Sequence, residues 1–347
     1  MILLAGHAAF AHAAPPAAMK FPADFGAHPD TRTEWWYVTG SLQADARLWG
    51  FQITFFRSTT GLASSPIAAS ASRFAATELV FAHAALTDLE QRRLRHDQRI
   101  ARSGFGIAQA DAGDTRVLLR DWRLVRSGNA YRAEVSSDSA GYALDLRITP
   151  SQPVLLQGES GLSRKGPGAE HTSHYYSEAQ LGVQGRLTLE GRAIEVTGKA
   201  WLDHEWSDAF IPPQAVGWDW IGMNLDDGSA LTAFRLRRAD GSSVYAGGSF
   251  RRADGQLRIF GPDEVMFTAG RVWQSASSKA SYPVQWTVTT PSGKFAVSAL
   301  LDNQELDNRG STGSIYWEGL SDLLDESGRR IGRGYLEMTG YAAALRL

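Results

Sequence analysis

Residues 225–256 read LDDGSALTAFRLRRADGSSVYAGGSFRRADGQ, in which three Asp-Gly pairs separate short apolar runs. Asp227-Gly228, Asp240-Gly241 and Asp254-Gly255 follow one another at intervals of 13 and 14 residues. An Asp-Gly pair between apolar runs is a strong hairpin signal, because both residues tolerate a positive φ. The spacing therefore predicts an antiparallel meander of strands of about five or six residues each. Such a meander must close on itself or pack against another sheet to protect its edges.

The same strand-and-turn pattern extends in both directions from this meander. Strand–helix alternation is absent, which argues against Rossmann, α/β-hydrolase and TIM-barrel architectures. The expected fold class is all-β, with an N-terminal half over 19–199 and a C-terminal half over 200–347. Strands are expected over 34–39 (ending at Gly40), 48–57, 77–87, 115–126, 129–136, 141–149, 180–190, 282–290, 294–301, 312–318 and 332–342, with a loop or short helix over 58–73, a long irregular loop over 157–173 and one short helical turn over 320–324.

The composition excludes several classes of function. The chain has 347 residues, of which 43% are hydrophobic and 21% charged, so a packed core is expected rather than disorder. A formal net charge of −2 provides no electrostatic footprint for a nucleic acid or an anionic membrane, and no nucleic-acid partner is expected. The absence of cysteine excludes disulfides, thiolate zinc sites, iron–sulfur clusters and cysteine nucleophiles.

Residues 1–18 read MILLAGHAAFAHAAPPAA, an apolar, Ala-rich segment that resembles the end of a secretory signal peptide. Ala11-His12-Ala13 is a small-x-small pattern, and Pro15-Pro16 follows it. A frayed N-terminus is the alternative interpretation. No later stretch approaches eighteen unbroken apolar residues, so no transmembrane segment is expected. The expected location is periplasmic or secreted.

Residues 201–206, WLDHEW, are the first segment that could carry chemistry. In a strand, Asp203 and Glu205 share one face, whereas His204 and Trp206 share the other. A histidine near aromatic surface and a carboxylate is a candidate acid or base. A histidine bonded to a backbone carbonyl inside a β-core would show the same pattern.

The second segment is Gly217-Trp218-Asp219-Trp220. In a strand, Asp219 points away from both tryptophans, toward a barrel interior or toward solvent. A carboxyl group in an apolar cavity has a raised pKa and can donate a proton. An exposed aspartate opposite two core tryptophans is the alternative.

Residues 32–37, RTEWWY, form a third segment with alternating faces. Glu34 and Trp36 share one face of the expected strand, and Trp35 lies on the other. If the Trp35 face is the core, Glu34 is expected to pair with Arg32 on the surface.

His171 and His174 lie three residues apart and could ligate a metal, with His204 or a carboxylate as a third ligand. Nothing in the sequence shows that these ligands converge, and no metal is expected. Phosphate loops and the motifs GxGxxG and GxSxG are absent. Gly158-Glu159-Ser160-Gly161 lacks the spacing of a nucleophile elbow. No cofactor is expected.

Taken together, these segments resemble the hydroxyneurosporene synthase family, which includes carotenoid 1,2-hydratases and the AttH-type secreted proteins. The resemblance runs from about residue 25 to the end of the chain. It is carried by residues 28–40, 81–88, 163–165, 174–177, 201–206, 217–220, 225–228, 316–319 and 334–341.

The resemblance implies two tandem lipocalin-like β-barrels or half-barrels packed together. It also implies a cofactor-free addition of water to an isoprenoid double bond: a carboxylic acid protonates the alkene, aromatic faces shelter the carbocation, and water adds. The family's essential histidine and tryptophan match His204 and Trp206, and its aromatic–acid pair falls on Trp218 and Asp219. The candidate catalytic residues are therefore Asp219, His204 and Trp206, and the candidate ligand-binding residues are Trp218, Trp220, Glu34, Trp36, Asp203, Glu205, His174 and Tyr176.

Three functions remain open from the sequence, each with a hydrophobic small molecule, isoprenoid or lipid-like, as the partner. The first is a hydro-lyase of the carotenoid 1,2-hydratase kind. The second is a non-catalytic envelope carrier associated with an ABC-type permease. The third is a secreted hydrolase, ranked last because no nucleophile motif is visible.

Overall fold

The computed structural model describes residues 18–62, 75–208 and 211–345. Strands dominate these residues, and one short 3₁₀ helix, η1 (Ala23–Phe25), precedes the first strand. Within this part of the chain, no helix is long and apolar enough to cross a membrane. The expected signal segment, apart from residue 18, and residues 63–73 of the expected loop lie outside the described residues.

The first sheet is antiparallel, in the order β4-β3-β2-β1-β13-β12-β9-β8-β7-β6-β5, and β10 and β11 pair with β12. Strands β3 and β4 at one edge contact β5 and β6 at the other, so the sheet curls into a nearly closed barrel. Its strands are β1 (Thr33–Ala44), β2 (Arg47–Thr59), β3 (Glu78–Asp88), β4 (Arg93–Arg102), β5 (Ala108–Ala110), β6 (Arg116–Leu119), β7 (Trp122–Ser127), β8 (Ala130–Ser137), β9 (Tyr142–Thr149), β10 (Leu155–Leu156), β11 (Leu162–Arg164), β12 (Thr172–Leu189) and β13 (Arg192–Ser207).

The second sheet is also antiparallel and has the order β17-β16-β15-β14-β25-β24-β22-β21-β18, with β23 paired to β24. A separate two-stranded ribbon, β19 (Val272–Gln274) and β20 (Ser281–Pro283), accompanies it. The strands of the second sheet are β14 (Gly217–Leu225), β15 (Ala230–Arg237), β16 (Ser243–Arg251), β17 (Leu257–Phe260), β18 (Met266–Ala269), β21 (Gln285–Thr290), β22 (Gly293–Ala299), β23 (Glu305–Asn308), β24 (Ser314–Leu324) and β25 (Arg330–Met338).

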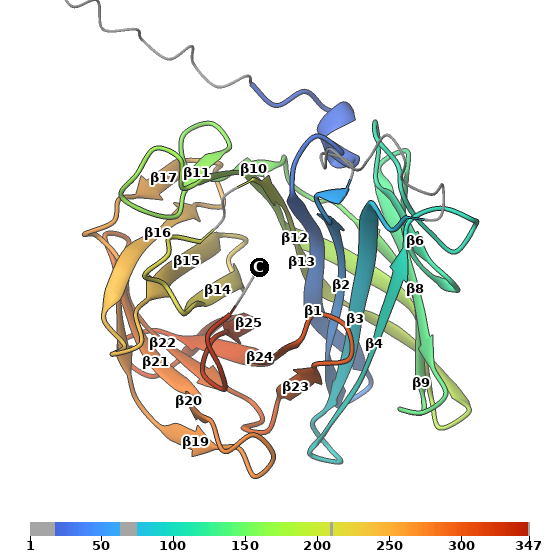
Figure 1. Cartoon of the computed structure of the whole chain (residues 1–347). Helices are drawn as coiled ribbons and strands as arrows, with labels where there is room; N and C mark the ends of the chain where they lie inside the picture. Colours follow the sequence, from blue (N-terminus) through green and yellow to red (C-terminus); the bar gives the residue numbers. More distant parts are fainter. Residues whose placement is uncertain (1–17, 63–74, 209–210, 346–347) are drawn as a thin grey trace, which may run out of the picture.

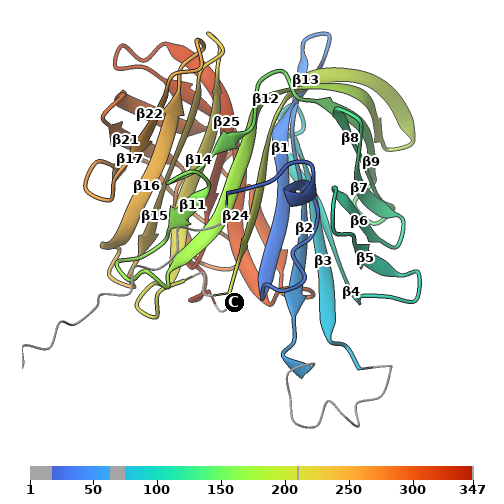
Figure 2. The same ribbon diagram turned by 90° about the horizontal axis from the view of Figure 1, so that it is seen from above.

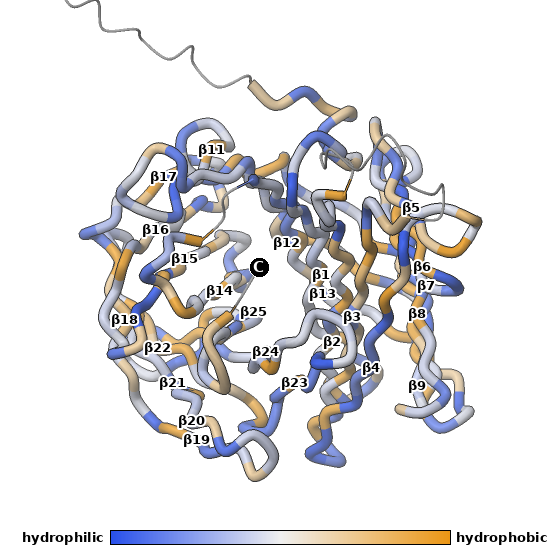
Figure 3. The backbone as a smooth tube through the Cα atoms, in the orientation of Figure 1, coloured by the Kyte–Doolittle hydropathy of each residue, from blue (hydrophilic) through white to orange (hydrophobic). Residues whose placement is uncertain are grey.

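The two sheets pack against each other through β1, β12 and β13 of the first and β14 and β25 of the second (Figure 1). Seen from above, the packed strands run between the two curved bodies (Figure 2). Apolar and polar residues interleave along the strands (Figure 3). Each sheet has its own buried core, and a third cluster of buried residues, including Tyr37, Trp201 and Trp220, joins the outer faces.

The all-β class, with two lipocalin-like curved sheets in tandem, is confirmed, and so is the Asp-Gly meander. Strands β14 to β17 follow one another in the sheet, and Gly228, Gly241 and Gly255 have φ values of 91°, 84° and 90° at the three turns. The expected boundary between residues 199 and 200 falls inside β13. The chain changes sheets between Ser207 and Gly217, because the whole of β13 belongs to the first sheet.

Some local predictions were wrong. The single strand expected over 115–126 is two strands, β6 and β7, which pair with each other across a turn at residues 120 and 121. The helical turn expected over 320–324 is the end of β24, where Leu320 and Leu323 are fully buried on opposite faces of the second sheet. Strand β1 does not end at Gly40 but continues to Ala44. A Cβ at Gly40 would lie 2.3 Å from the backbone oxygen of Lys199, so this glycine allows close strand pairing rather than ending the strand.

Candidate functional site

Strand β13 presents different chemistry on its two faces, as the alternation of residues 201–206 predicts. His204 and Trp206 point into the interior of the first sheet. Asp203 and Glu205 point toward the second sheet and line a cavity between the two sheets. Both carboxyls are almost fully buried.

This cavity, called the cleft below, has a volume of about 110 Å³. Its walls come from both sheets and from the loop before β12, and most of the exposed wall is apolar. It is lined by Thr33, Trp35, Tyr37, Thr54, Phe56, Lys165, Tyr175, Asp203, Glu205, Trp218, Trp220, Phe234, Leu236, Tyr316, Glu318 and Glu337.

Glu318 and Glu337 form a carboxyl pair on the second sheet. They lie directly opposite each other on β24 and β25, where two like charges would repel. Burial, together with the charge of Glu337, raises the pKa of Glu318 well above its usual range. Burial also raises the pKa of Glu337, against a hydrogen bond from Trp218. The pair therefore retains at least one proton at neutral pH, as adjacent buried carboxyls generally do.

The carboxyl pair also leaves hydrogen-bonding capacity unused. Within the described part of the chain, Oε1 of Glu318 is buried without a hydrogen bond of good geometry. The hydroxyl of Tyr37 also lacks a hydrogen bond of good geometry, but it lies close enough to Glu318 for a weak hydrogen bond between the two to affect the pKa of each. Buried polar atoms normally find partners, so a ligand or a water molecule in the cleft would compete with this weak contact between Tyr37 and Glu318.

Asp203 is the third acid of the cleft. Its Oδ1 accepts hydrogen bonds from Trp201 Nε1 at 2.6 Å and Ser177 Oγ at 2.5 Å, and its Oδ2 accepts one from the Tyr175 hydroxyl at 2.8 Å. Burial outweighs these donors and raises the pKa of Asp203 from 3.8 to about 7. This carboxyl is therefore poised to exchange a proton near neutral pH.

Glu205 differs from the other three acids because it has a cation as a partner. Lys165 Nζ lies 2.8 Å from its Oε1, and Ser173 Oγ donates a hydrogen bond to the same oxygen. Burial raises the pKa of Glu205, and Lys165 opposes that effect. The cleft therefore holds an ion-paired carboxylate, Glu205, together with carboxyls whose pKa values are raised.

Aromatic rings enclose the acids. Trp220 meets Tyr37 edge to face at 5.4 Å between centroids, and its Nε1 donates to the Tyr175 hydroxyl at 3.2 Å. The ammonium of Lys165 lies over the rings of Tyr175 and Phe234. Aromatic faces in a dry cleft stabilise a positive charge.

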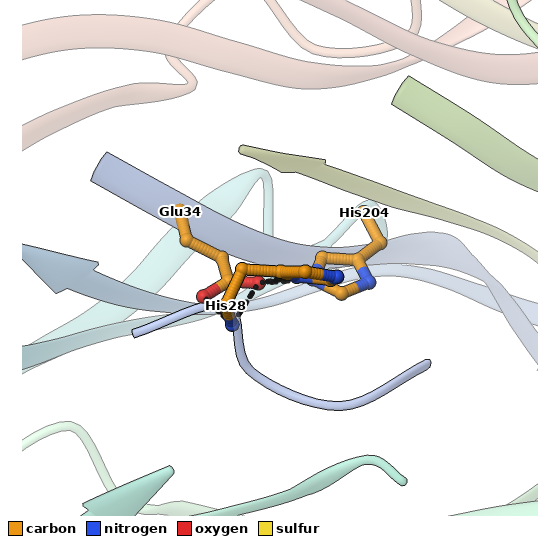
Figure 4. Close-up of side chains that lie close together, drawn as sticks. All are labelled: His28, Glu34 and His204. Atoms are coloured by element: carbon orange, nitrogen blue, oxygen red, sulfur yellow. Dashed lines mark hydrogen bonds and ion pairs between the residues drawn. The ribbon is translucent and has the colours of Figure 1, made fainter. Parts of the chain in front are cut away.

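On the other side of β13, His204 belongs to a separate buried network (Figure 4). Glu34 Oε1 accepts hydrogen bonds from His204 Nε2 at 2.8 Å and His28 Nδ1 at 2.7 Å. Its other oxygen pairs with Arg57 Nε at 2.8 Å. Burial opposes the ionised form, but the two histidines lower the pKa of Glu34 far below its usual range. The expected surface pairing with Arg32 was therefore wrong, because Glu34 faces the core.

The remaining predicted residues of the first sheet surround this network. Trp206 stacks on His28 at 3.7 Å and lies parallel to His174 at 5.3 Å between centroids. Trp36 stacks on His204 at 4.6 Å between centroids, and the Tyr176 hydroxyl lies 3.0 Å from Nδ1 of His204. These side chains fill the interior of the first sheet and do not line the cleft.

The ligand-type atoms of His28, Glu34 and His204 lie within 4.8 Å of one another, so a metal must be considered. Each atom already takes part in a hydrogen bond, and the guanidinium of Arg57 neutralises Glu34. A second positive charge beside Arg57 would be repelled. The trio is better described as a hydrogen-bond network. His171 and His174, which the sequence offered as ligands only if a metal were present, belong to no such group among the described residues.

Asp219 lies apart from both sets. It points into the second sheet, where Arg235 Nε is 2.7 Å from its Oδ2 and the Tyr341 hydroxyl donates to its Oδ1 at 2.8 Å. Of the predicted residues, only Asp203, Glu205, Trp218 and Trp220 meet in the cleft.

Sequence reasoning missed Lys165, Glu318 and Glu337. The available signal was that each lies in a segment that carries the family resemblance, and that both glutamates interrupt β-rich, largely apolar runs.

Comparison with known proteins supports the fold and identifies one family model. The model described as AttH-like matches residues 12–341. A crystal structure assigned to AttH from Nitrosomonas europaea is 47% identical, with a TM-score of 0.87, and the match covers 94% of this chain and 98% of that one. No curated protein matches the chain.

Two more distant structures share the fold. Kievitone hydratase from Nectria haematococca is 14% identical, with a TM-score of 0.70 and 94% of each chain covered. CghA, in a crystal structure with Sch210972, is 11% identical, with a TM-score of 0.51, and the match covers 89% of this chain and 88% of that one.

Proposed function

The chain belongs to the AttH-like family, and we propose that it adds water to a carbon–carbon double bond of an isoprenoid or lipid-like molecule in the cleft. The observation that carries this proposal is the pair formed by buried Glu318 and half-buried Glu337, whose raised pKa values keep a carboxylic acid neutral beside tryptophan rings. A neutral acid in an apolar site is suited to protonate an alkene. The similarity of the fold to that of kievitone hydratase is consistent with a hydration.

The proposed reaction balances without a cofactor. One carboxyl of the pair gives its proton to the less substituted alkene carbon, and the π electrons form the new C–H bond. The resulting carbocation lies against the faces of Trp218 and Trp220. Water forms the C–O bond and passes a proton to Glu205, whose ionised form is favoured by Lys165. Proton exchange with solvent then restores both carboxyls, and the product is an alcohol.

This proposal assigns the chemistry to the cleft rather than to Asp219, His204 and Trp206. Asp219 is neutralised by Arg235 inside the second sheet. His204 and Trp206 lie behind β13, where they hold the strand that carries Asp203 and Glu205.

The test is to incubate the purified protein with prenyl alcohols in heavy-oxygen water and to analyse the extract by mass spectrometry. The gain of one labelled water by the alkene supports the proposal. Glu318→Gln should lower turnover by about 10²–10⁴-fold while the fold persists. Asp322→Asn is the matched control, because Asp322 lies on the same strand but pairs with Arg333 outside the cleft. An unchanged compound retained at one per chain would instead indicate a non-catalytic carrier.

We also propose that the protein acts outside the cytoplasm, where an ABC-type permease is its proposed partner. The Ala-rich segment 1–18 supports export. Fractionation of cells that express the full chain tests this proposal, and recovery in the cytoplasmic fraction alone would contradict it.

A further inference from the structure

A second cavity, called the groove below, lies beside the loop that carries Lys165. Its volume is about 370 Å³. One wall comes from residues before β12 and the other from β15, β16 and β17. It is lined by Gln157, Gly158, Glu159, Leu162, Ser163, Arg164, Ala169, Thr172, Phe234, Tyr245, Gly247, Gly248, Ile259, Phe260 and Gly261.

Two adjacent glycines of β16, Gly247 and Gly248, line the groove. A Cβ at Gly247 would lie 3.0 Å from the ring of Phe234. A Cβ at Gly248 would lie 2.2 Å from the backbone oxygen of Thr232. A side chain at Gly247 would therefore push against Phe234, and one at Gly248 would collide with the backbone of β15.

Phe234 is a wall of both cavities. The ammonium of Lys165, which pairs with Glu205 in the cleft, lies 4.4 Å from the centroid of its ring. The ring of Tyr245 extends the same wall along the groove, 6.5 Å away between centroids. Phe234 thus lies at the boundary between the cleft and the groove.

The volumes of the two cavities indicate that they hold different parts of one ligand. Ligand cavities usually measure about 300–1,000 Å³, and the cleft alone, at about 110 Å³, holds only the reacting end of such a molecule. The groove falls within the usual range. Ile259 in its wall keeps 39% of its surface exposed, which leaves apolar area for a ligand to cover.

We infer that the groove binds the apolar chain of the substrate whose double bond lies in the cleft, and that Phe234 is the point at which this chain passes from one cavity to the other. This inference rests on the proposed function for the identity of the reacting end. It predicts that affinity depends on chain length and that this dependence is set in the groove.

The experiment measures the binding of prenyl alcohols of five, ten, fifteen and twenty carbons by the change in tryptophan fluorescence. In the unmodified protein, the fifteen-carbon alcohol should bind at least about tenfold more tightly than the five-carbon one. Ala169→Trp fills the groove from an exposed position that lines it, so folding should be preserved. Glu170→Trp places the same bulk one residue further along, outside both linings.

With Ala169→Trp, the fifteen-carbon alcohol should lose about tenfold in affinity while the five-carbon alcohol stays within about twofold. Glu170→Trp should change neither. Equal effects of Ala169→Trp on both alcohols, or no effect on the longer one, would overturn the inference. The heavy-oxygen assay separates the two proposals. Length-dependent binding without hydration would refute the proposed reaction and support chain binding in the groove. Hydration that is insensitive to Ala169→Trp would support the reaction and refute chain binding in the groove.

Discussion

Replacement of Asp203 by asparagine should alter the pH dependence of folding. Burial raises the pKa of Asp203 from 3.8 to about 7, so the folded protein retains a proton that the unfolded chain releases over this interval. Because the folded-state pKa is the higher one, the stabilisation is complete below pH 3.8 and is lost as the pH rises through 7. At about 1.4 kcal/mol per pKa unit, the free energy of unfolding should fall by about 4 kcal/mol from this group.

Asparagine reproduces the protonated form of Asp203. Its amide oxygen can accept from Trp201 and Ser177, and its amide nitrogen can donate to the oxygen of Tyr175, as the protonated carboxyl would. The variant should therefore match the unmodified protein at low pH and become relatively more stable by about 4 kcal/mol as the pH rises.

The assay is urea unfolding followed by tryptophan fluorescence at several values between about pH 4 and 8. The quantity to compare is the variant minus the unmodified protein, because His83 opposes Asp203 in nearly the same interval. Asp145→Asn, which removes an exposed partner of Arg132, should leave the slope unchanged. A difference that stays constant with pH would mean that Asp203 is ionised in the folded state, and the reasoning about burial would be refuted.

Three further changes test other parts of the structure. Burial lowers the pKa of His83 to about 3, so its stabilisation is present above pH 6.5 and lost as the pH falls; His83→Gln should lose less stability on acidification, as urea midpoints would reveal. Glu34→Gln leaves the buried guanidinium of Arg57 without its closest carboxylate and should cost about 3–5 kcal/mol by urea unfolding; a loss below about 1 kcal/mol would contradict the network. Lys165→Met removes the cation that favours ionised Glu205, so the acidic limb of the pH–rate profile should move to higher pH. An unmoved limb would exclude Glu205 as the base.

Much of the fold could be predicted because it depends on local chemistry. The Asp-Gly pairs specify hairpins through their backbone preferences, and β14 to β17 follow from them. Alternation placed Asp203 and His204 on opposite faces of β13 without any tertiary information. The end of β1 and the strand at 320–324 could not be predicted, because a close interstrand approach at Gly40 and a buried two-faced strand leave no local signature.

The site was less predictable because its acids come from distant strands. Glu318 and Glu337 are separated by a hairpin and become neighbours only through the register of β24 and β25. Lys165 reaches Glu205 from a loop whose path the sequence does not specify. Asp219 was the candidate proton donor because it is a carboxylic acid between two tryptophans. Its partner Arg235, on the adjacent strand β15, balances its charge, and the sequence alone does not reveal this pairing.

The Glu34–His204 network lies on one face of β13, and Asp203 and Glu205 lie on the other, so the register of this strand positions both sets. Glu34 bonds to His204 across paired strands, and the same pairing sets Tyr37 opposite Asp203 on the other face. A slip of one residue would exchange the two faces, placing Asp203 against the core and His204 in the cleft. Because burying an unpaired carboxylate is costly, the Glu34–His204 bond and its Arg57 ion pair disfavour that slip. In the proposed reaction, His204 would therefore act through the register of β13 and not through contact with the substrate.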